Sequence, residues 1–225
     1  MGKKLNSAIL FVSATIFCLA WGTICQVELS AAEVEKATKA APATADKPIT
    51  LDTDPHLVGW WKFDESSGKT AADASKHGRT GTLEGGLSFE KDSVSGRIGK
   101  ALMLDGRDDC IEVAGYKGVS GTEPRTVSAW IKTSSSRGEI TTWGADDYGK
   151  MWRFGHIRGR IGLTPSGGYL YINAGTDDDE WHHVAIVVQD VELPNLHDDV
   201  KLYKAGEVAA IHDIGLLDLW PVNTG

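Results

Sequence analysis

Three acidic loops hold the side chains best suited to bind a metal ion. Each is a cluster of carboxylates in a polar turn: Asp105, Asp108 and Asp109; Asp146 and Asp147; and residues 177–180, which begin with Asp177 and Asp178. Calcium takes about six to eight oxygen ligands from such loops, although none of the three has EF-hand spacing. The sequence predicts calcium as a cofactor, with five candidate ligands: Asp105, Asp108, Asp109, Asp177 and Asp178. The alternative is that these acids are ordinary solvated turn residues.

Aromatic residues beside one of these loops could bind a sugar ring. The segment from Trp143 to Tyr148 places an aromatic residue at each end of a loop that contains Asp146 and Asp147. An aromatic face stacks on a sugar, and carboxylates accept hydrogen bonds from sugar hydroxyl groups. With Tyr169 as a further aromatic candidate, the predicted ligand-binding residues are Trp143, Asp146, Asp147, Tyr148 and Trp152. Core packing of each tryptophan is the alternative.

His182 and His183 could suggest a metal ion or a general base. Neighbouring residues on a strand face opposite sides, so the two imidazoles do not easily share one ion. We interpret the pair as residues that stabilise the start of a strand through side-chain hydrogen bonds.

The N-terminus has the layout of a secretory signal. Lys3 and Lys4 precede an apolar run over residues 8–25, and small residues at 30–32 suit cleavage after Ala32. We predict a signal peptide at 1–32, a flexible linker at 33–53 and a secreted or cell-surface domain at 54–225. An uncleaved membrane anchor, and a short helix over 31–40, are the alternatives.

Charge and cysteine content narrow the class of protein. The 225 residues include 31 acids against 23 Lys and Arg, a net charge of −8, which argues against a nucleic-acid partner. Cys18 and Cys25 lie in the predicted signal, so Cys110 is left alone and the domain forms no internal disulfide. We expect Cys110 to be a small buried residue, with an intermolecular disulfide as the alternative.

Short strands must position these residues. The central one is predicted at 181–188, with Val184, Ile186 and Val188 on one face. An Asp-Gly turn at Asp105 and Gly106 predicts a hairpin of strands 101–104 and 110–113. The sequence as a whole predicts an all-β antiparallel sandwich, whose other strands are 56–63, 81–83, 87–89, 125–133, 139–143, 151–154, 158–163, 169–173, 200–203 and 207–211.

Five motifs, in this order, resemble those of the laminin-G-like domains in the concanavalin A-like lectin/glucanase superfamily. They cover residues 56–212 and read WWKFDE (60–65), ALMLDG (101–106), TVSAWIK (126–132), WHHVA (181–185) and LY (202–203) followed by Gly206. The resemblance implies a jelly roll of two antiparallel sheets, often with calcium at its rim.

The chain departs from that family in three places. The family usually has an aromatic residue where Cys110 stands and an Asp-Gly turn where Ala205 and Gly206 stand. It also usually closes with one more strand after the last motif. The resemblance therefore predicts a missing last strand, which means either C-terminal truncation of the domain or an open sheet edge near residues 57–63.

Catalysis is not expected. Hydrolases of this superfamily carry a Glu-x-Asp-x-x-Glu pattern, which Glu90 and Asp92 begin but Ser95 interrupts. We expect no catalytic residue and an exported recognition module that binds a carbohydrate or an extracellular protein, assisted by calcium. The alternatives are a structural spacer domain and, further off, a degenerate glycosidase. Contact with a membrane is expected only if the N-terminal segment stays uncleaved, and the oligomeric state stays open.

Overall fold

The computed structural model describes residues 8–12, 51–216 and 222–224. Of the described residues, 8–12, 56–216 and 222–224 belong to one compact unit, whereas Leu51–Thr53 forms a short 3-10 helix (η1) in a second unit. The predicted cleavage site and most of the predicted linker lie outside the described residues. Within the described part, no helix has the length and apolar character needed to cross a membrane.

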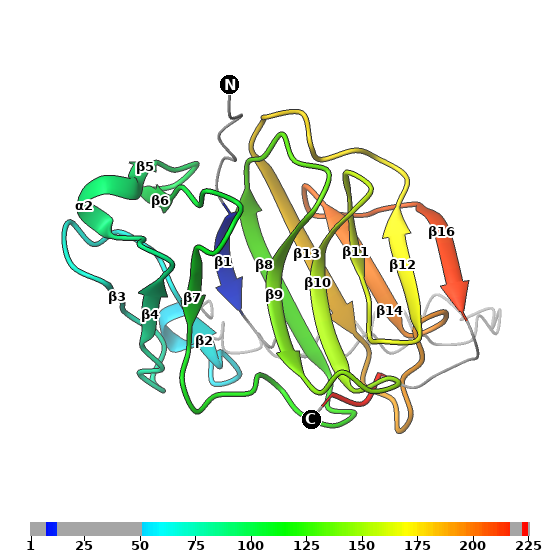
Figure 1. The fold of residues 1–225 in the computed structure, drawn as a ribbon. Helices are drawn as coiled ribbons and strands as arrows, with labels where there is room; N and C mark the ends of the chain where they lie inside the picture. Colours follow the sequence, from blue (N-terminus) through cyan, green and yellow to red (C-terminus); the bar gives the residue numbers. More distant parts are fainter. Residues whose placement is uncertain (1–7, 13–50, 217–221, 225) are drawn as a thin grey trace, which may run out of the picture. The chain divides into compact units, whose positions relative to one another are not determined.

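The expectation of an all-β fold of antiparallel sheets is confirmed (Figure 1). The largest sheet has six strands in the order β15-β14-β13-β8-β1-β2. Their bounds are β1 Ala8–Val12, β2 Gly59–Trp60, β8 Arg125–Ile131, β13 His182–Val188, β14 Val200–Lys204 and β15 Glu207–Val208.

The predicted central strand is β13, which pairs with β14 on one side and with β8 on the other. Its Val184, Ile186 and Val188 are buried, as predicted. On β8 the alternation puts Val127, Ala129 and Ile131 into the same core. Successive residues of a strand point to opposite faces of the sheet, so every second residue is buried where one face packs on a core.

The second sheet has five strands in the order β16-β12-β11-β10-β9. Its inner face carries buried residues from three neighbouring strands, among them Phe154, Ile161 and Leu170. These residues join the core cluster of the first sheet, so the two sheets pack face to face. The bounds are β9 Gly138–Gly144, β10 Met151–Ile157, β11 Arg160–Leu163, β12 Gly168–Ile172 and β16 Ile211–Leu216.

The predicted hairpin of 101–104 with 110–113 is wrong. β6 (Lys100–Leu102) pairs with β5 (Ser93–Ser95), whereas β7 (Cys110–Glu112) pairs with β4 (Gly81–Glu84), which in turn pairs with β3 (Thr70–Ala71). A long acidic loop separates β6 from β7. Because of this loop, β6 and β7 can pair with different strands in different sheets.

Three further strand predictions need correction. Residues 87–89 do not form a strand, because Phe89–Asp92 is a one-turn helix (α2) whose Phe89 is buried and whose Asp92 accepts a hydrogen bond from the Ser88 amide at 2.8 Å. The strand over 56–63 is confined to β2 at the sheet edge: Trp61 bridges Asp73 instead, and Phe63 has a left-handed φ of 60° that ends the extended backbone. The strand over 207–211 is split, since Ile211 begins β16 in the other sheet.

The predicted burial of Cys110 is also wrong. β7 is an edge strand of the three-stranded sheet, and the thiol of Cys110 is exposed there. Desolvation and the neighbouring carboxylates, Glu84 first, raise the pKa of this thiol. Cys110 is therefore a protonated surface thiol at neutral pH.

Candidate functional site

Two tyrosines stand side by side on the outer face of the five-stranded sheet. Tyr169 and Tyr171 alternate along β12 with the buried Leu170, so they point away from the core. Their rings stack with centroids 5.7 Å apart and an interplanar angle of 21°. Both phenol groups donate to the same oxygen, Oδ2 of Asp213, at 3.2 and 3.4 Å. These three residues, together with Arg158, Arg160, Asn173 and His212, are named the tyrosine cluster.

The neighbouring strand β16 positions the carboxylate. Asp213 is the direct cross-strand partner of Tyr171 in the antiparallel pair of β12 and β16. Directly opposed residues share a sheet face, which is why the carboxylate reaches both hydroxyls. The hydrogen bond from Tyr169 to Asp213, together with the carboxylate charge, raises the pKa of Tyr169, while Arg158 opposes the shift. Tyr169 is therefore a neutral donor at physiological pH.

Two arginines reach the cluster, Arg158 from the turn between β10 and β11 and Arg160 from the start of β11. Arg158 and Gly159 both have positive φ, 53° and 77°, as a two-residue hairpin turn of the I′ type requires. The turn brings Nη1 of Arg158 to 3.3 Å from the Tyr171 hydroxyl, to which it donates. The guanidinium of Arg160 lies 5.9 Å from the Tyr171 ring centroid. Cationic groups thus border the aromatic pair.

His212 and Asn173 complete the rim. The His212 ring lies 5.3 Å from the Tyr171 ring, and its Nδ1 is 3.1 Å from Oδ1 of Asn173. Both residues are exposed. Tyr171 is only 1% exposed beneath these neighbours, whereas Tyr169 is partly open to solvent. Tyr171 therefore forms the base of the cluster, and Tyr169 provides its accessible aromatic face.

Two glycines make room for the tyrosines. Gly215 is the cross-strand partner of Tyr169, and a Cβ at this position would lie 2.3 Å from Cε1 of the Tyr169 ring. Gly162 is the partner of Tyr171, and a Cβ there would lie 2.9 Å from the Tyr171 Cβ. A larger residue at 215 would displace the Tyr169 ring, whereas one at 162 would first meet the Leu170 carbonyl oxygen, 2.5 Å from the added Cβ, and Ile157 Cδ1, 2.7 Å from it.

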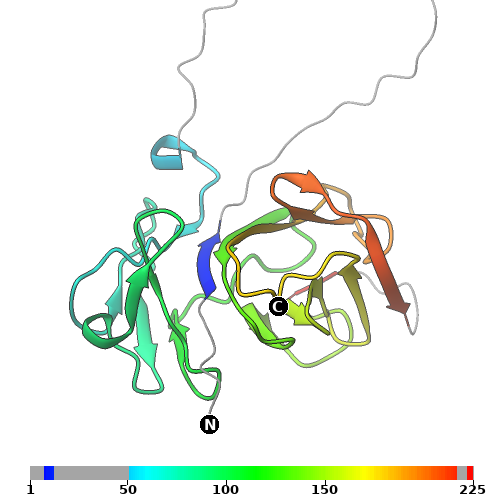
Figure 2. The same cartoon turned by 90° about the horizontal axis from the view of Figure 1, so that it is seen from above.

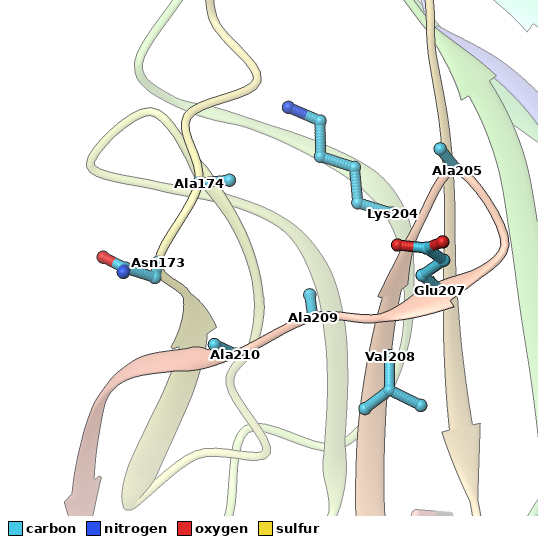
Figure 3. Close-up of a pocket in the computed structure, with 8 residues that line it drawn as sticks. All are labelled: Asn173, Ala174, Lys204, Ala205, Glu207, Val208, Ala209 and Ala210. Carbon is cyan, nitrogen blue, oxygen red and sulfur yellow. The ribbon is translucent and has the colours of Figure 1, made fainter.

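A hollow of about 430 Å³ adjoins the cluster (Figure 3). Lys204 and Glu207 line it from β14 and β15, and Asn173 lines it from the opposite side. The Lys204 ammonium donates to the Gly175 carbonyl at 2.8 Å. Because Asn173 also contacts His212, the hollow and the tyrosine cluster share a residue.

Sequence reasoning named only Tyr169 from this cluster. The alternation of Tyr169 with Tyr171 on one predicted strand was a usable signal for an aromatic pair. The approach of Asp213, 42 positions from Tyr171, had no sequence signal of its own.

The predicted ligand residues lie in two different environments. Trp143 and Trp152 stack with centroids 4.7 Å apart at 13°. Trp152 is 0% exposed and donates from Nε1 to Oγ1 of Thr141 at 3.0 Å. The assignment of Trp152 to a ligand-accessible surface is therefore wrong, because it is a core residue. Trp143, on β9, is partly buried against the same core.

The other three predicted ligand residues lie together in an exposed loop. Asp147 accepts from the Lys150 ammonium at 2.7 Å, and this contact lowers the pKa of Asp147. Asp146 accepts from the Ser166 hydroxyl at 3.2 Å. Tyr148 is 52% exposed beside Gly167. This loop offers a second aromatic and acidic surface.

The predicted metal ligands divide into two groups. Asp105, Asp108 and Asp109 can each offer a carboxylate oxygen within 4.8 Å of the others. Asp109 also accepts from the amide of Asp105 at 2.9 Å, and Asp105 from that of Arg107 at 2.8 Å. Carboxylate oxygens suit calcium, but one oxygen of Asp105 and one of Asp109 already accept hydrogen bonds from backbone amides of the loop.

The other two predicted ligands do not join this group in the described part of the chain. Asp177 packs over Gly159, and Oδ1 of Asp178 lies 2.8 Å from Nε2 of His182. The expected hydrogen-bonding role of His182 at the start of the strand is thereby confirmed, while His183 packs against the Trp130 ring at 5.3 Å.

Comparisons of the chain with protein-family models, curated proteins and solved structures find no match.

Proposed function

We propose that this chain is an exported, non-catalytic recognition module that binds a carbohydrate, and that the tyrosine cluster is its binding surface. The observation that carries the proposal is the stacked pair of Tyr169 and Tyr171, both hydrogen-bonded to Asp213. The module would act at the cell surface or in the secreted fraction.

The cluster has the groups that sugar recognition requires. The partly exposed face of Tyr169 offers apolar area on which a pyranose ring can stack. Asp213 can accept hydrogen bonds from hydroxyl groups, while Arg158 and Arg160 can donate them. Because both tyrosines are held by the same carboxylate, the surface is organised before the ligand arrives, which lowers the entropic cost of binding.

The proposed architecture is the jelly roll implied by the resemblance to laminin-G-like domains. Two antiparallel sheets that share one core agree with it. Calcium at the loop of Asp105, Asp108 and Asp109 is part of the same proposal, with the proximity of the three carboxylates as its support.

The test is binding of the full chain to a panel of neutral and acidic polysaccharides, followed by calorimetry on any that bind. Tyr169→Ala should weaken binding by about tenfold or more, the equivalent of about 1.4 kcal/mol. Asp213→Asn should weaken it less, because the amide keeps an oxygen acceptor.

A Tyr148→Ala variant separates the two candidate surfaces. Retained affinity supports the tyrosine cluster, whereas loss with Tyr148→Ala and retention with Tyr169→Ala would move the site to the loop at 146–148. A thermal shift with calcium that chelator abolishes would support the metal, since a ligand of the native state raises the melting temperature. No binding to any glycan by a cooperatively folded chain would favour a spacer domain.

A further inference from the structure

One strand of the six-stranded sheet comes from the far N-terminus. β1 (Ala8–Val12) lies between β8 and β2 and runs antiparallel to both (Figure 2 shows it in blue). All five of its residues have partners on β8, and two also have partners on β2. Without β1, the described part of the sheet would leave one edge of β8 unpaired.

The register of β1 matches the polarity of β8. Positions 8, 10 and 12 stand opposite Ile131, Ala129 and Val127, which are all buried in the core. Positions 9 and 11 stand opposite Trp130 and Ser128, which are partly exposed. The segment AILFV is apolar at every position, so it suits both faces of this place in the sheet.

We propose that the edge of β8 is a docking site for an extended apolar strand, and that Ala8–Val12 of the same chain occupies it. In strand addition, main-chain hydrogen bonds supply affinity and alternate side-chain positions supply specificity. The same five residues also begin the apolar run of the predicted signal. The segment therefore has a second role, as a strand that completes the sheet before cleavage.

A disulfide trap tests this pairing in the full chain, produced without export so that the N-terminus is retained. Cys18, Cys25 and Cys110 are replaced by Ser, and the pair Phe11→Cys and Ser128→Cys is introduced at directly opposed positions. Opposed Cα atoms in an antiparallel pair lie about 4.5–5.5 Å apart, within the range of about 4.4–6.8 Å that a disulfide spans. After oxidation, peptide mapping should find an intramolecular 11–128 bridge.

The matched control moves one cysteine by one residue. Leu10→Cys with Ser128→Cys places the thiols on opposite faces of the sheet, so it should form little or no bridge. Failure of the 11–128 pair to bridge in a chain that still melts cooperatively would overturn the proposal. Equal yields of the disulfide in the 11–128 and 10–128 variants would show that the register of β1 against β8 is wrong. A bridge between two chains would overturn the same-chain occupant and point to a second copy.

Hydrogen exchange gives a measurement that needs no new cysteine. Leu10→Pro removes an amide from the middle of β1 and should disrupt its pairing. Protection of the peptide that covers β8 should then fall by about tenfold or more, while β11 and β12 in the other sheet keep theirs. Unchanged protection of β8 would overturn the proposal. Since neither test involves Tyr169 or Asp213, their outcome is independent of the proposed glycan binding.

Discussion

The Arg125 guanidinium donates a hydrogen bond to Oγ1 of Thr224, although 99 positions separate the two residues. Arg125 is only 2% exposed, and it also donates to the carbonyls of Val119, Gly121 and Glu123. Burial lowers the pKa of Arg125 to about 10, so the group stays charged at neutral pH. A buried cation surrounded by carbonyl groups thus ties the segment around Thr224 to the loop before β8.

Replacing this arginine should destabilise the fold strongly. Arg125→Met keeps the length of the side chain but removes the donors to three partly buried carbonyls, of which those of Val119 and Gly121 still accept from Thr224. We expect the free energy of unfolding to fall by about 2–3 kcal/mol, because several hydrogen bonds are lost and the Glu123 carbonyl loses its donor, at a cost of about 1–3 kcal/mol for an unsatisfied group. Urea unfolding followed by tryptophan fluorescence measures the loss. Thr224→Val should cost about 1 kcal/mol, the usual net worth of a hydrogen bond. An Arg125→Met variant as stable as the parent would contradict the assigned role.

Trp152 should behave as a core residue. Trp152→Ala removes a fully buried ring that stacks on Trp143, so we expect a loss of about 4 kcal/mol in the free energy of unfolding. Leu193→Ala is the matched control, because Leu193 is 68% exposed and its truncation should change stability by about 0.5 kcal/mol or less. Similar losses for the two variants in chemical denaturation would refute the core assignment.

Acid should weaken the fold through His156. Burial lowers the pKa of this imidazole, although the hydrogen bond with Thr176 and the charge of Asp177 act to raise it. The unfolded chain takes up the proton near pH 6.5 while the folded chain resists until a lower pH, so stability falls as pH drops below about 6.5. Denaturation midpoints should therefore fall less steeply between about pH 7 and pH 5 for His156→Gln than for the parent.

A comparison at higher pH completes this test. Above about pH 7.5 the imidazole is neutral in both the folded and the unfolded chain. The difference in stability between parent and His156→Gln should then be constant. A parent and variant with the same slope between about pH 5 and pH 7 would show that His156 does not contribute to acid sensitivity.

The role of the Tyr169 ring position in binding can be tested without changing the tyrosine itself. Gly215→Ala places a methyl group 2.3 Å from the Tyr169 ring, so the ring must move. We expect about tenfold weaker binding of any glycan that binds the parent, measured by calorimetry. Gly175→Ala is the control, because its Cβ would meet its nearest neighbour, Asp177, at an ordinary 3.4 Å. Equal affinities for parent and Gly215→Ala would argue against the cluster as the binding surface.

The strand predictions held where local alternation was strong. β8 and β13 were predicted as strands from their apolar residues at alternate positions, and Val127, Ala129 and Ile131, like Val184 and its alternating neighbours, are buried in the structure. Predictions failed where a residue's surroundings depend on remote parts of the chain. Trp152 looked like a neighbour of the loop at 146–148, yet its side chain points into the core shared by both sheets.

The sequence by itself determined the all-β class and most strand positions, because these follow from residues a few positions apart. Only the tertiary structure decided which strands became neighbours. It separated β6 from β7, and it brought Asp213 of β16 to Tyr169 and Tyr171 of β12. Pairing and register between distant strands depend on the packing of the whole core, and alternation along one strand carries no information about its partner.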